Sequence, residues 1–310
     1  MAEEEGHEDS ARAIVAAFIA NLGIAVAKLV AFAFTGAASM LAESVHSIAD
    51  TGNQGLLILG RRRARRPADE AHPFGFARER YFWSFVVAVI LFTVGSMFAL
   101  FEAVEKLRKP HELESVGWAI ATLVLAIVLE TFSLRTALQE VGDARGSSSL
   151  WQFVIDTKHP DLPVVLLEDI GALIGLVFAL AGIGLAELTG NPRFDAVGSL
   201  AIGLLLGGIA ITLARQMKSL LIGEGAHPNV LRTIRERVEA GDKVRRLYGM
   251  RTEHYGPDDL LVAAKIDLDP DLTFPQVAKE IDDAEARVRA DVPEARIIYL
   301  EPDVFRPERT

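Results

Sequence analysis

The chain has 310 residues, half of them hydrophobic, and its apolar residues are gathered in the first two thirds, which is typical of a membrane-embedded part followed by a soluble part. A formal net charge of −10 argues against a nucleic acid as partner, because a duplex binder needs a basic face to neutralise phosphates. No cysteine is present, so disulfides and thiolate metal sites are excluded, and a bound metal ion must use imidazole, carboxylate or water.

The chain begins with an acidic tail over residues 1–10, MAEEEGHEDS. A cleaved secretory signal would need a basic segment at this position. We therefore expect Met1 to be the mature start and the first apolar stretch to be a retained helix.

Six apolar stretches predict a six-helix transmembrane domain over residues 11–217. A helix that spans a bilayer needs about 20 mostly apolar residues, and each stretch meets this requirement, some with polar interruptions. Only a Thr-Gly-Ala turn separates the first two, so these are expected to form an antiparallel hairpin. The stretches are Ala11 to Phe34, Ala37 to Gly60, Tyr81 to Leu107, Val116 to Leu138, Pro163 to Leu188 and Phe194 to Met217.

Basic residues between the second and third stretches indicate the orientation. The run RRRARR (Arg61–Arg66) is followed by Arg78 and Arg80, and positively charged loops stay in the cytoplasm. The basic residues of Lys106–Lys109 give a weaker opposing bias. With an even number of spans, both termini are expected in the cytoplasm and the protein in the cell (inner) membrane.

Residues 218–310 have a soluble pattern that predicts a small cytoplasmic α+β domain of the ferredoxin-like type. The order is helix, strand, strand, helix, strand, which forms a compact two-layer module. It contains no catalytic motif, and the chain is not expected to be an enzyme. The expected elements are Asn229–Glu239, Arg245–Glu253, Leu260–Leu268, Phe274–Ala290 and the strand ARIIYL, while GSSS at Gly146–Ser149 predicts a flexible loop.

The second stretch carries an unusual polar stripe. Ionisable groups at the bilayer centre cost about 2.5 to 3.5 kcal/mol, so they are expected to face protein or a water-filled cavity. His46 and Asp50 are four residues apart and Glu43 is three before His46, so the three project from one face of a helix. An imidazole and a carboxylate at this spacing form half of a tetrahedral zinc site. Asn53 and Gln54 extend the stripe, and hydrogen bonding between helices is the favoured role for them, because amides commonly serve in this way.

Acidic residues in two other stretches extend this pattern. Glu168 and Asp169 lie in the apolar fifth stretch, where adjacent helical positions differ by about 100 degrees, so only one points squarely at a given site. A buried ion pair with Lys28 or with a loop arginine is the alternative for this pair. Glu130 lies in the fourth stretch at a depth similar to that of Asp50, as a ligand, a proton relay or a structural partner.

Several motifs in the same order resemble the cation diffusion facilitator family of six-span metal and proton antiporters, which usually work as homodimers. The motifs are His46 followed by Asp50, HPFGFARER after the basic loop, and FDAVGSLAIGLLLG in the sixth stretch. HSIADTGNQGLL, HPFGF and VLLEDIGALIG look most like the branch that includes the mitochondrial zinc exporter of animals. The resemblance covers nearly the whole chain.

The resemblance implies a transport site with His46, Asp50 and Asp169 as ligands. Val165 stands where most relatives have a histidine, four residues before Asp169, and our hypothesis is that Glu168 replaces that ligand, with water or Glu130 as the fallback.

The resemblance also concerns two cytoplasmic metal sites. Asp69 and His72 match a loop site of some relatives, but Phe76 stands in place of its second histidine, so that site is expected to be weak or absent. In the C-terminal domain the family's metal positions are filled by residues that include a lysine, so we expect a dimerising domain without a binuclear zinc site. These positions are Tyr248, Lys265, Tyr299 and Glu301.

The sequence thus predicts a proton-coupled antiporter that exports divalent metal cations. Zinc is the expected transported substrate, with cobalt, manganese or ferrous iron as further candidates, and no organic cofactor is expected. The expected partners are the metal ion, protons, the lipid bilayer and a second copy of the chain. The alternative is a non-transporting membrane scaffold or metal sensor that acts through its cytoplasmic domain.

Overall fold

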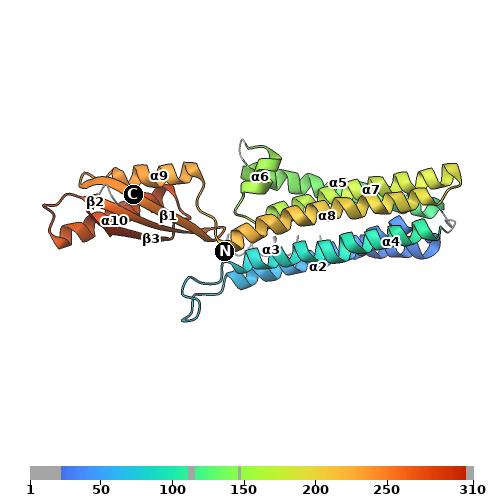
Figure 1. Ribbon diagram of the computed structural model, residues 1–310, viewed down its shortest axis with the longest axis horizontal. Coiled ribbons are helices and arrows are strands. Elements are labelled where there is room, and N and C mark those ends of the chain that lie inside the picture. Colours follow the sequence, from blue (N-terminus) through green and yellow to red (C-terminus); the bar gives the residue numbers. More distant parts are fainter. Residues whose placement is uncertain (1–21, 111–115, 146–147, 305–310) are drawn as a thin grey trace, which may run out of the picture. The chain divides into compact units, whose positions relative to one another are not determined.

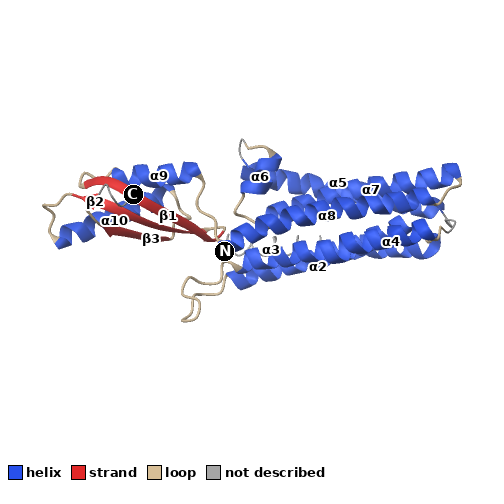
Figure 2. Ribbon diagram, in the orientation of Figure 1, coloured by secondary structure: helices blue, strands red, loops and turns tan. Residues whose placement is uncertain are grey.

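A computed structural model describes residues 22–110, 116–145 and 148–304, so the acidic tail 1–10 lies outside the described residues. The chain divides into two compact units. The helical unit extends up to Arg61 and then over Phe82–Met217, and the C-terminal unit combines the loop Arg62–Tyr81 with the chain from Lys218 onward. Among the residues that the structure describes, all strands belong to the C-terminal unit (Figure 2). The structure does not describe the side chains of eight residues within the helices, namely Ala38, Ser39, Ala42, Glu43, His46, Glu140, Asp143 and Ala144.

The helical unit consists of long helices with short connections (Figure 1). The described part of the first helix is Leu22–Thr35. The elements that follow are α2 (Ala38–Ala64), α3 (Glu79–Ile90), the π-helical segment η1 (Leu91–Ser96), α4 (Met97–Arg108), α5 (Val116–Arg145), α6 (Leu150–Asp156), α7 (Asp161–Thr189) and α8 (Arg193–Ile222).

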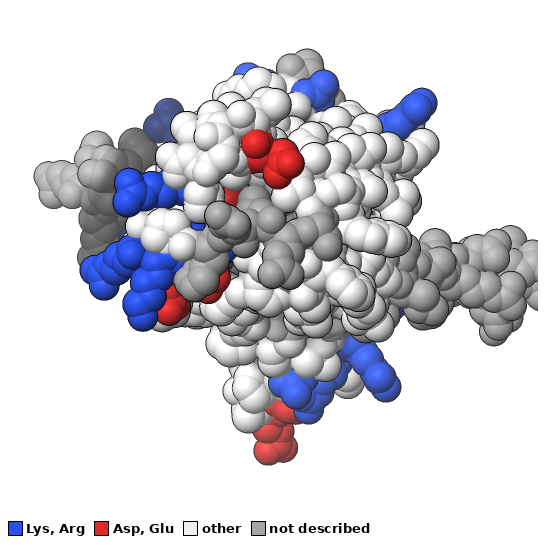
Figure 3. Space-filling model, turned by 90° about the vertical axis from the view of Figure 1, so that its right-hand side faces the viewer, with Lys and Arg blue, Asp and Glu red and all other residues white. Residues whose placement is uncertain are grey.

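Within the described chain, four helical segments are long and apolar enough to cross a membrane. They are the continuous helix from α3 to α4, residues Val116–Gln139 of α5, and the helices α7 and α8. Viewed from the end where α7 turns into α8, most of the surface in view carries no Lys, Arg, Asp or Glu (Figure 3). Large apolar side chains such as Phe101, Trp118 and Phe132 are exposed on these helices, as expected where a surface meets a membrane.

The two remaining expected spans are not confirmed as such. The first helix is described only from Leu22, which leaves a shorter apolar segment. Helix α2 has 27 residues, enough to span a bilayer, but its polar stripe and the arginines at its end lower its hydropathy.

The turn between the first helix and α2 confirms the predicted hairpin connection. Gly36 has φ +60°, a left-handed conformation that suits glycine, and its N–H donates to the carbonyl of Phe32. The carbonyl of Gly36 accepts a hydrogen bond from Lys106, with 3.2 Å between Nζ and O. Lys106 therefore stabilises this turn. This contact gives a structural role to one of the basic residues whose charge opposes the predicted orientation.

Close backbone packing joins α8 to η1 and α4. Ser96 Oγ donates to the carbonyl oxygen of Gly203 at 2.7 Å, and both groups are buried. A Cβ atom on Gly203 would lie 2.8 Å from Leu100 Cγ, and one on Gly207 would lie 2.8 Å from Ser96 Oγ. Small residues let transmembrane helices approach in this way. The apolar core continues from this contact through side chains that include Val87, Leu91, Leu123, Leu176, Ile202 and Leu206.

The connection between α5 and α7 contains the predicted GSSS segment and a further short helix. Helix α5 continues to Arg145, and the short helix α6 begins directly after Ser149, whose Oγ accepts a hydrogen bond from the N–H of Gln152. Phe153 and Val154 of α6 are buried against Leu166 of α7. The serines of the GSSS motif therefore include a helix cap, while Gly146 and Ser147 lie outside the described residues.

The C-terminal unit has the predicted order of elements. They are α9 (Pro228–Glu239), β1 (Val244–Gly256), β2 (Asp259–Leu268), α10 (Phe274–Asp291) and β3 (Ile297–Pro302). The sheet order is β1-β2-β3, with β1 antiparallel and β3 parallel to β2. The described part of this α+β module thus has three strands and lacks the first strand of the β-α-β-β-α-β ferredoxin-like pattern.

The loop between α2 and α3 packs on the β1–β2 hairpin of the C-terminal unit. The rings of Phe74 and Tyr255 stack with centroids 4.7 Å apart, and the guanidinium of Arg78 lies 4.5 Å from the centroid of the Tyr255 ring. Arg78 also forms an ion pair with Glu253. These contacts involve side chains at the tip of the loop and at its return to α3.

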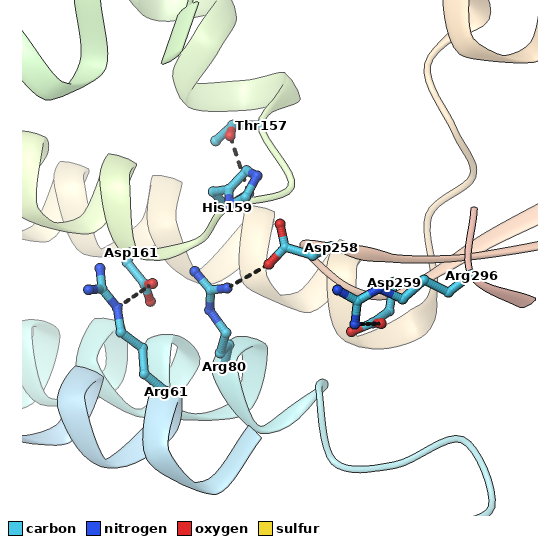
Figure 4. Close-up of polar contacts among 8 residues, drawn as sticks. All are labelled: Arg61, Arg80, Thr157, His159, Asp161, Asp258, Asp259 and Arg296. Carbon is cyan, nitrogen blue, oxygen red and sulfur yellow. Dashed lines mark hydrogen bonds and ion pairs between the residues drawn. The ribbon is translucent and has the colours of Figure 1, made fainter. Parts of the chain in front are cut away.

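Two further contacts fix the end of the same loop. Arg80 and Asp258 form an ion pair with 3.4 Å between Nη1 and Oδ2 (Figure 4). A Cβ atom on Gly256 would lie 2.5 Å from the Cβ of Ala77, so the two backbones are in close contact. The sequence places this loop within the segment 11–217, whereas these contacts group it with the C-terminal unit.

Candidate metal-transport site

Helix α2 carries the predicted polar stripe, and its C-terminal part is largely buried. Asn53 is fully buried, Asp50 and Gln54 are half-buried, and Ser47 is buried one turn before Asp50. Glu43 and His46 lie on the same helix, but their side chains are outside what the structure describes. The helical geometry over Ala38–Ala64 nevertheless places His46 one turn before Asp50.

Glu168 of α7 reaches the α2 stripe through Asn53. The amide Nδ2 of Asn53 donates to Glu168 Oε1 at 2.7 Å, and both side chains are almost completely buried. Glu168 also acts electrostatically on Asp50. The structure therefore brings three of the predicted site residues together from two helices.

Asp169 turns toward α5. Ser133 Oγ donates to Asp169 Oδ2 at 2.9 Å, and Glu130 lies one turn before Ser133 on the same helix. Val165, one turn before Asp169, packs against the apolar core. The adjacent residues Glu168 and Asp169 thus have different partners, in keeping with the angular offset expected from the sequence.

The charges around Asp50 are mainly negative. Glu168, Glu130 and Asp169 act on it electrostatically, as does the fully buried Lys28. Lys28 Nζ donates to Ser47 Oγ at 2.7 Å. Buried carboxylates are costly without compensation, so this cluster favours the uptake of protons or of a cation.

The cluster is not a closed ligand set. Among the described side chains, no three His, Asp or Glu residues are placed so that they could hold a metal ion together. His46 is outside that search. Glu168 bonds to Asn53 while Asp169 bonds to Ser133, so binding of a cation by Asp50, Glu168 and Asp169 together requires a change in side-chain or helix positions.

The predicted loop site contains two potential ligands. Asp69 Oδ1 accepts from the backbone N–H of His72 at 2.7 Å and lies 3.0 Å from His72 Nδ1, and both side chains are about half exposed. The backbone hydrogen bond lowers the pKa of Asp69. The Phe76 ring lies 4.4 Å from the His72 ring and 4.4 Å from the guanidinium carbon of Arg66. The His72 ring thus lies beside an aromatic ring at the position of the family's third ligand.

The four C-terminal positions matched to the family's metal sites lie together on the sheet. They line a groove of about 570 Å³. Lys265 Nζ donates to Glu301 Oε1 at 3.0 Å and to Asp303 Oδ2 at 2.9 Å, and these hydrogen bonds, that to Asp303 first, raise the pKa of Lys265. Desolvation raises the pKa of Tyr248 beside them. One ammonium group thus pairs with two acidic groups of this groove.

Three residues with polar contacts in the helical unit were not predicted as site residues. Ser133 is one, although its spacing of three from Glu130 places both on one face of α5. The others are Arg61 and Asp161, which form an ion pair with 2.8 Å between Nε and Oδ2 (Figure 4). Asp161 is 2% exposed. Arg61 was part of the basic run that predicts the orientation, and Asp161 in the first turn of α7 carried no signal of its own.

Comparison with known proteins identifies a family for most of the chain. Residues 14–222 match the cation efflux transmembrane domain family. The protein named proton-coupled zinc antiporter SLC30A9, mitochondrial, from Xenopus laevis is 35% identical over 244 residues, which are 78% of this chain and 44% of the relative. The chain therefore spans less than half the length of that relative. The manganese efflux system protein MneP of Bacillus subtilis is 26% identical over 309 residues, 96% of this chain and 98% of MneP.

A solved structure of a MamM C-terminal domain variant in its nickel form matches 26% of this chain and all of its own, at 20% identity and a TM-score of 0.24. A likeness at this TM-score carries no argument, and the assignment rests on the family match over residues 14–222. That match covers more than half of the chain and includes the polar stripe of α2 and the acidic pair of α7. The chain belongs to the cation efflux family, also called the cation diffusion facilitators.

Proposed function

We propose that this chain is a proton-coupled antiporter that exports divalent metal cations from the cytoplasm by alternating access, with zinc as the main substrate. The observation that carries the proposal is the cluster of acidic side chains, Asp50, Glu168, Asp169 and Glu130, inside a bundle of apolar helices. Intramembrane acidic residues mark ion pathways. The role is that of a transporter and not of an enzyme, in keeping with the names of the relatives.

The proposed ligands are His46, Asp50, Asp169 and Glu168. Imidazole and carboxylate donors without sulfur suit zinc, and they also accept cobalt, manganese or ferrous iron. The printed names of the relatives include both a zinc antiporter and a manganese efflux protein. In this proposal the cation draws Asp169 toward α2, and the residues that line the pathway are Glu43, Asn53, Gln54 and Glu130.

Proton exchange follows from competition for these ligands. A metal ion binds deprotonated imidazole and carboxylate groups, so loading from the cytoplasm expels protons. When the site opens to a more acidic outer face, protons rebind and release the metal. A proton gradient thereby drives metal export.

The proposed topology has six spans, with both termini on the cytoplasmic side of the cell membrane. The segment that ends with Leu22–Thr35 and the polar helix α2 would complete the bundle, because the buried stripe of α2 faces other helices and not lipid. The C-terminal unit serves as a dimerisation domain in this proposal, without a binuclear zinc site. The loop pair Asp69 and His72 holds metal weakly or not at all.

Zinc flux into everted membrane vesicles tests this proposal. We expect uptake driven by downhill proton counterflow, and its loss in His46→Ala and in Asp50→Ala while both variants remain in the membrane. Unchanged flux in both variants would refute the proposed site.

The alternative is a membrane scaffold or metal sensor that does not transport. It is favoured by the finding that no three described His, Asp or Glu side chains are arranged around a common metal position. Absence of flux of zinc, cobalt, manganese and ferrous iron in a folded wild-type protein would support this alternative.

A further inference from the structure

Two polar bridges join α2 to α7. The inner bridge is the hydrogen bond between Asn53 and Glu168, and the outer bridge is the ion pair between Arg61 and Asp161 (Figure 4). Arg61 follows Asn53 by eight residues, about 12 Å along a helix, and Asp161 precedes Glu168 by seven, about 10.5 Å. The two bridges are therefore about two helical turns apart on both helices.

Two such bridges constrain the helices more than either alone. A single hydrogen bond between two helices allows them to pivot about it, whereas a second bridge two turns away fixes their relative rotation and splay. The inner bridge involves Asn53, which lies one helical turn after Asp50, and Glu168 acts electrostatically on Asp50. The outer bridge therefore acts on the distance between acidic groups of α2 and α7.

The burial of Asp161 favours a bridge that stays closed. Its side chain is 2% exposed, while that of Arg61 is half exposed. If the helices separated at this end, the buried carboxylate of Asp161 would lose the guanidinium of Arg61, and breaking an ion pair with a buried partner is strongly unfavourable. A contact that must open in every cycle would be expected to expose both partners.

We propose that Arg61 and Asp161 are a positioning pair that holds α2 and α7 together as one body throughout the transport cycle. The two helices then supply ligands at a constant spacing, and the alternating openings occur along other helix contacts. This inference rests on the proposed function and adds two residues that do not touch the cation.

The test compares zinc transport by purified protein in proteoliposomes, expressed per folded protein. Arg61→Gln and Asp161→Asn should each raise the KM for zinc about tenfold or more, the range seen when groups that orient metal ligands are lost, with a smaller change in kcat. Arg61→Lys keeps a cation beside Asp161 and should lie close to wild type. Equilibrium zinc binding in detergent should weaken by the same factor as KM rises.

The matched control is Arg62→Ala, which removes an exposed arginine from the next position of α2 without touching Asp161. Its KM should equal that of wild type. If it rises as much as in Arg61→Gln, the arginines act through the general field of the basic run and the positioning role is refuted. Wild-type KM in Arg61→Gln and Asp161→Asn also refutes it, because a pair that only stabilises the fold changes the amount of folded protein and not its affinity.

A bridging experiment tests independently whether the two helices stay together during transport. The chain has no cysteine, so a double variant with Arg61→Cys and Asp161→Cys can be joined specifically by a cleavable bifunctional thiol reagent. Transport that continues after bridging supports a pair that stays closed. Transport that stops on bridging and returns on cleavage would show that the helices must part here, which overturns the proposal.

Different results refute the proposed transport function and the positioning role of Arg61 and Asp161. A folded wild-type protein that moves no divalent cation refutes the proposed function. Normal wild-type flux with unaltered KM in the variants refutes the positioning pair alone.

Discussion

The side-chain amide of Asn53 donates a hydrogen bond of 2.7 Å from Nδ2 to the buried carboxylate oxygen Oε1 of Glu168, 115 residues later in the chain. The donor is neutral, so it orients the carboxylate without cancelling its charge. The contact therefore orients Glu168 toward α2 without placing a positive charge beside it. The sequence favours Asn53 as a contact between helices, and in the structure its partner is one of the proposed ligands.

Replacing Asn53 should affect stability and zinc binding together. In Asn53→Ala the carboxylate of Glu168 loses a buried donor, and a hydrogen bond to a charged group is worth about 1.5 to 3 kcal/mol. We expect a lower melting temperature in detergent and weaker zinc binding by calorimetry. Gln54→Ala, a neighbour that is only half-buried, serves as control and should change both quantities less. Equal effects in the two variants would show that the Asn53–Glu168 contact has no special role.

The packing of α8 predicts opposite results for two nearby glycines. Gly203→Ala places a Cβ atom 2.8 Å from Leu100 Cγ, so the helices must shift, and overpacking costs about 1 to 3 kcal/mol. Gly208→Ala meets no atom within 4 Å and should be neutral or slightly stabilising. Thermal unfolding of the purified variants measures the difference. Equal melting temperatures would contradict the close approach of α8 to α4.

The loop between α2 and α3 should loosen when Tyr255 is removed. The Tyr255 ring stacks on Phe74 and lies against Arg78, and an aromatic pair contributes about 0.5 to 1.5 kcal/mol. We expect Tyr255→Ala to increase hydrogen exchange over residues 66–78. Tyr299→Ala, which removes a tyrosine on β3, is the control and should leave exchange in the loop unchanged. Unaltered exchange in Tyr255→Ala would show that the loop does not depend on this contact.

Lys265 should determine whether the groove on the sheet accepts a metal ion. Its ammonium group is paired with Glu301 and Asp303, so Lys265→Ala leaves two carboxylates without their cation. We expect zinc to raise the melting temperature of the C-terminal unit in Lys265→Ala but not in a protein that keeps Lys265. Lys279→Ala removes a lysine from another exposed ion pair, with Asp283, and should create no response to zinc. A zinc response in the Lys279 variant as well would point to nonspecific binding.

The same lysine predicts how the stability of the C-terminal unit depends on pH. Hydrogen bonds to Asp303 and Glu301 raise the pKa of Lys265 above its unfolded value of about 10.4. Its contribution is then fully present below about pH 10.4 and is lost as the pH rises through the folded-state pKa. The free energy of unfolding, measured by hydrogen exchange of β2 and β3 in denaturant titrations, should fall at alkaline pH in the wild type. It should fall less in Lys265→Met. An identical alkaline loss in both proteins would refute the assignment.

Part of the candidate site could be predicted from the sequence because it depends on local spacing. His46 and Asp50 share a helix face by their separation of four, and Glu168 and Asp169 stand out as charges in an apolar run. The partners of these groups could not be predicted. Whether Glu168 or Asp169 faces α2 depends on the rotation of α7, which is set by packing, and so the bonds to Asn53 and Ser133 emerge only from the structure.

The sequence by itself determined the apolar helices, the polar stripe of α2 and the order of elements after Lys218, because hydropathy and periodicity are properties of short segments. Tertiary structure decided the rest. It gave the arginines of the basic run different partners, with Arg61 bound to Asp161, and it placed the α2–α3 loop on the β1–β2 hairpin. It also made β2 and β3 parallel neighbours. These contacts join residues far apart in the chain, and their selection depends on how whole elements pack, which no local pattern records.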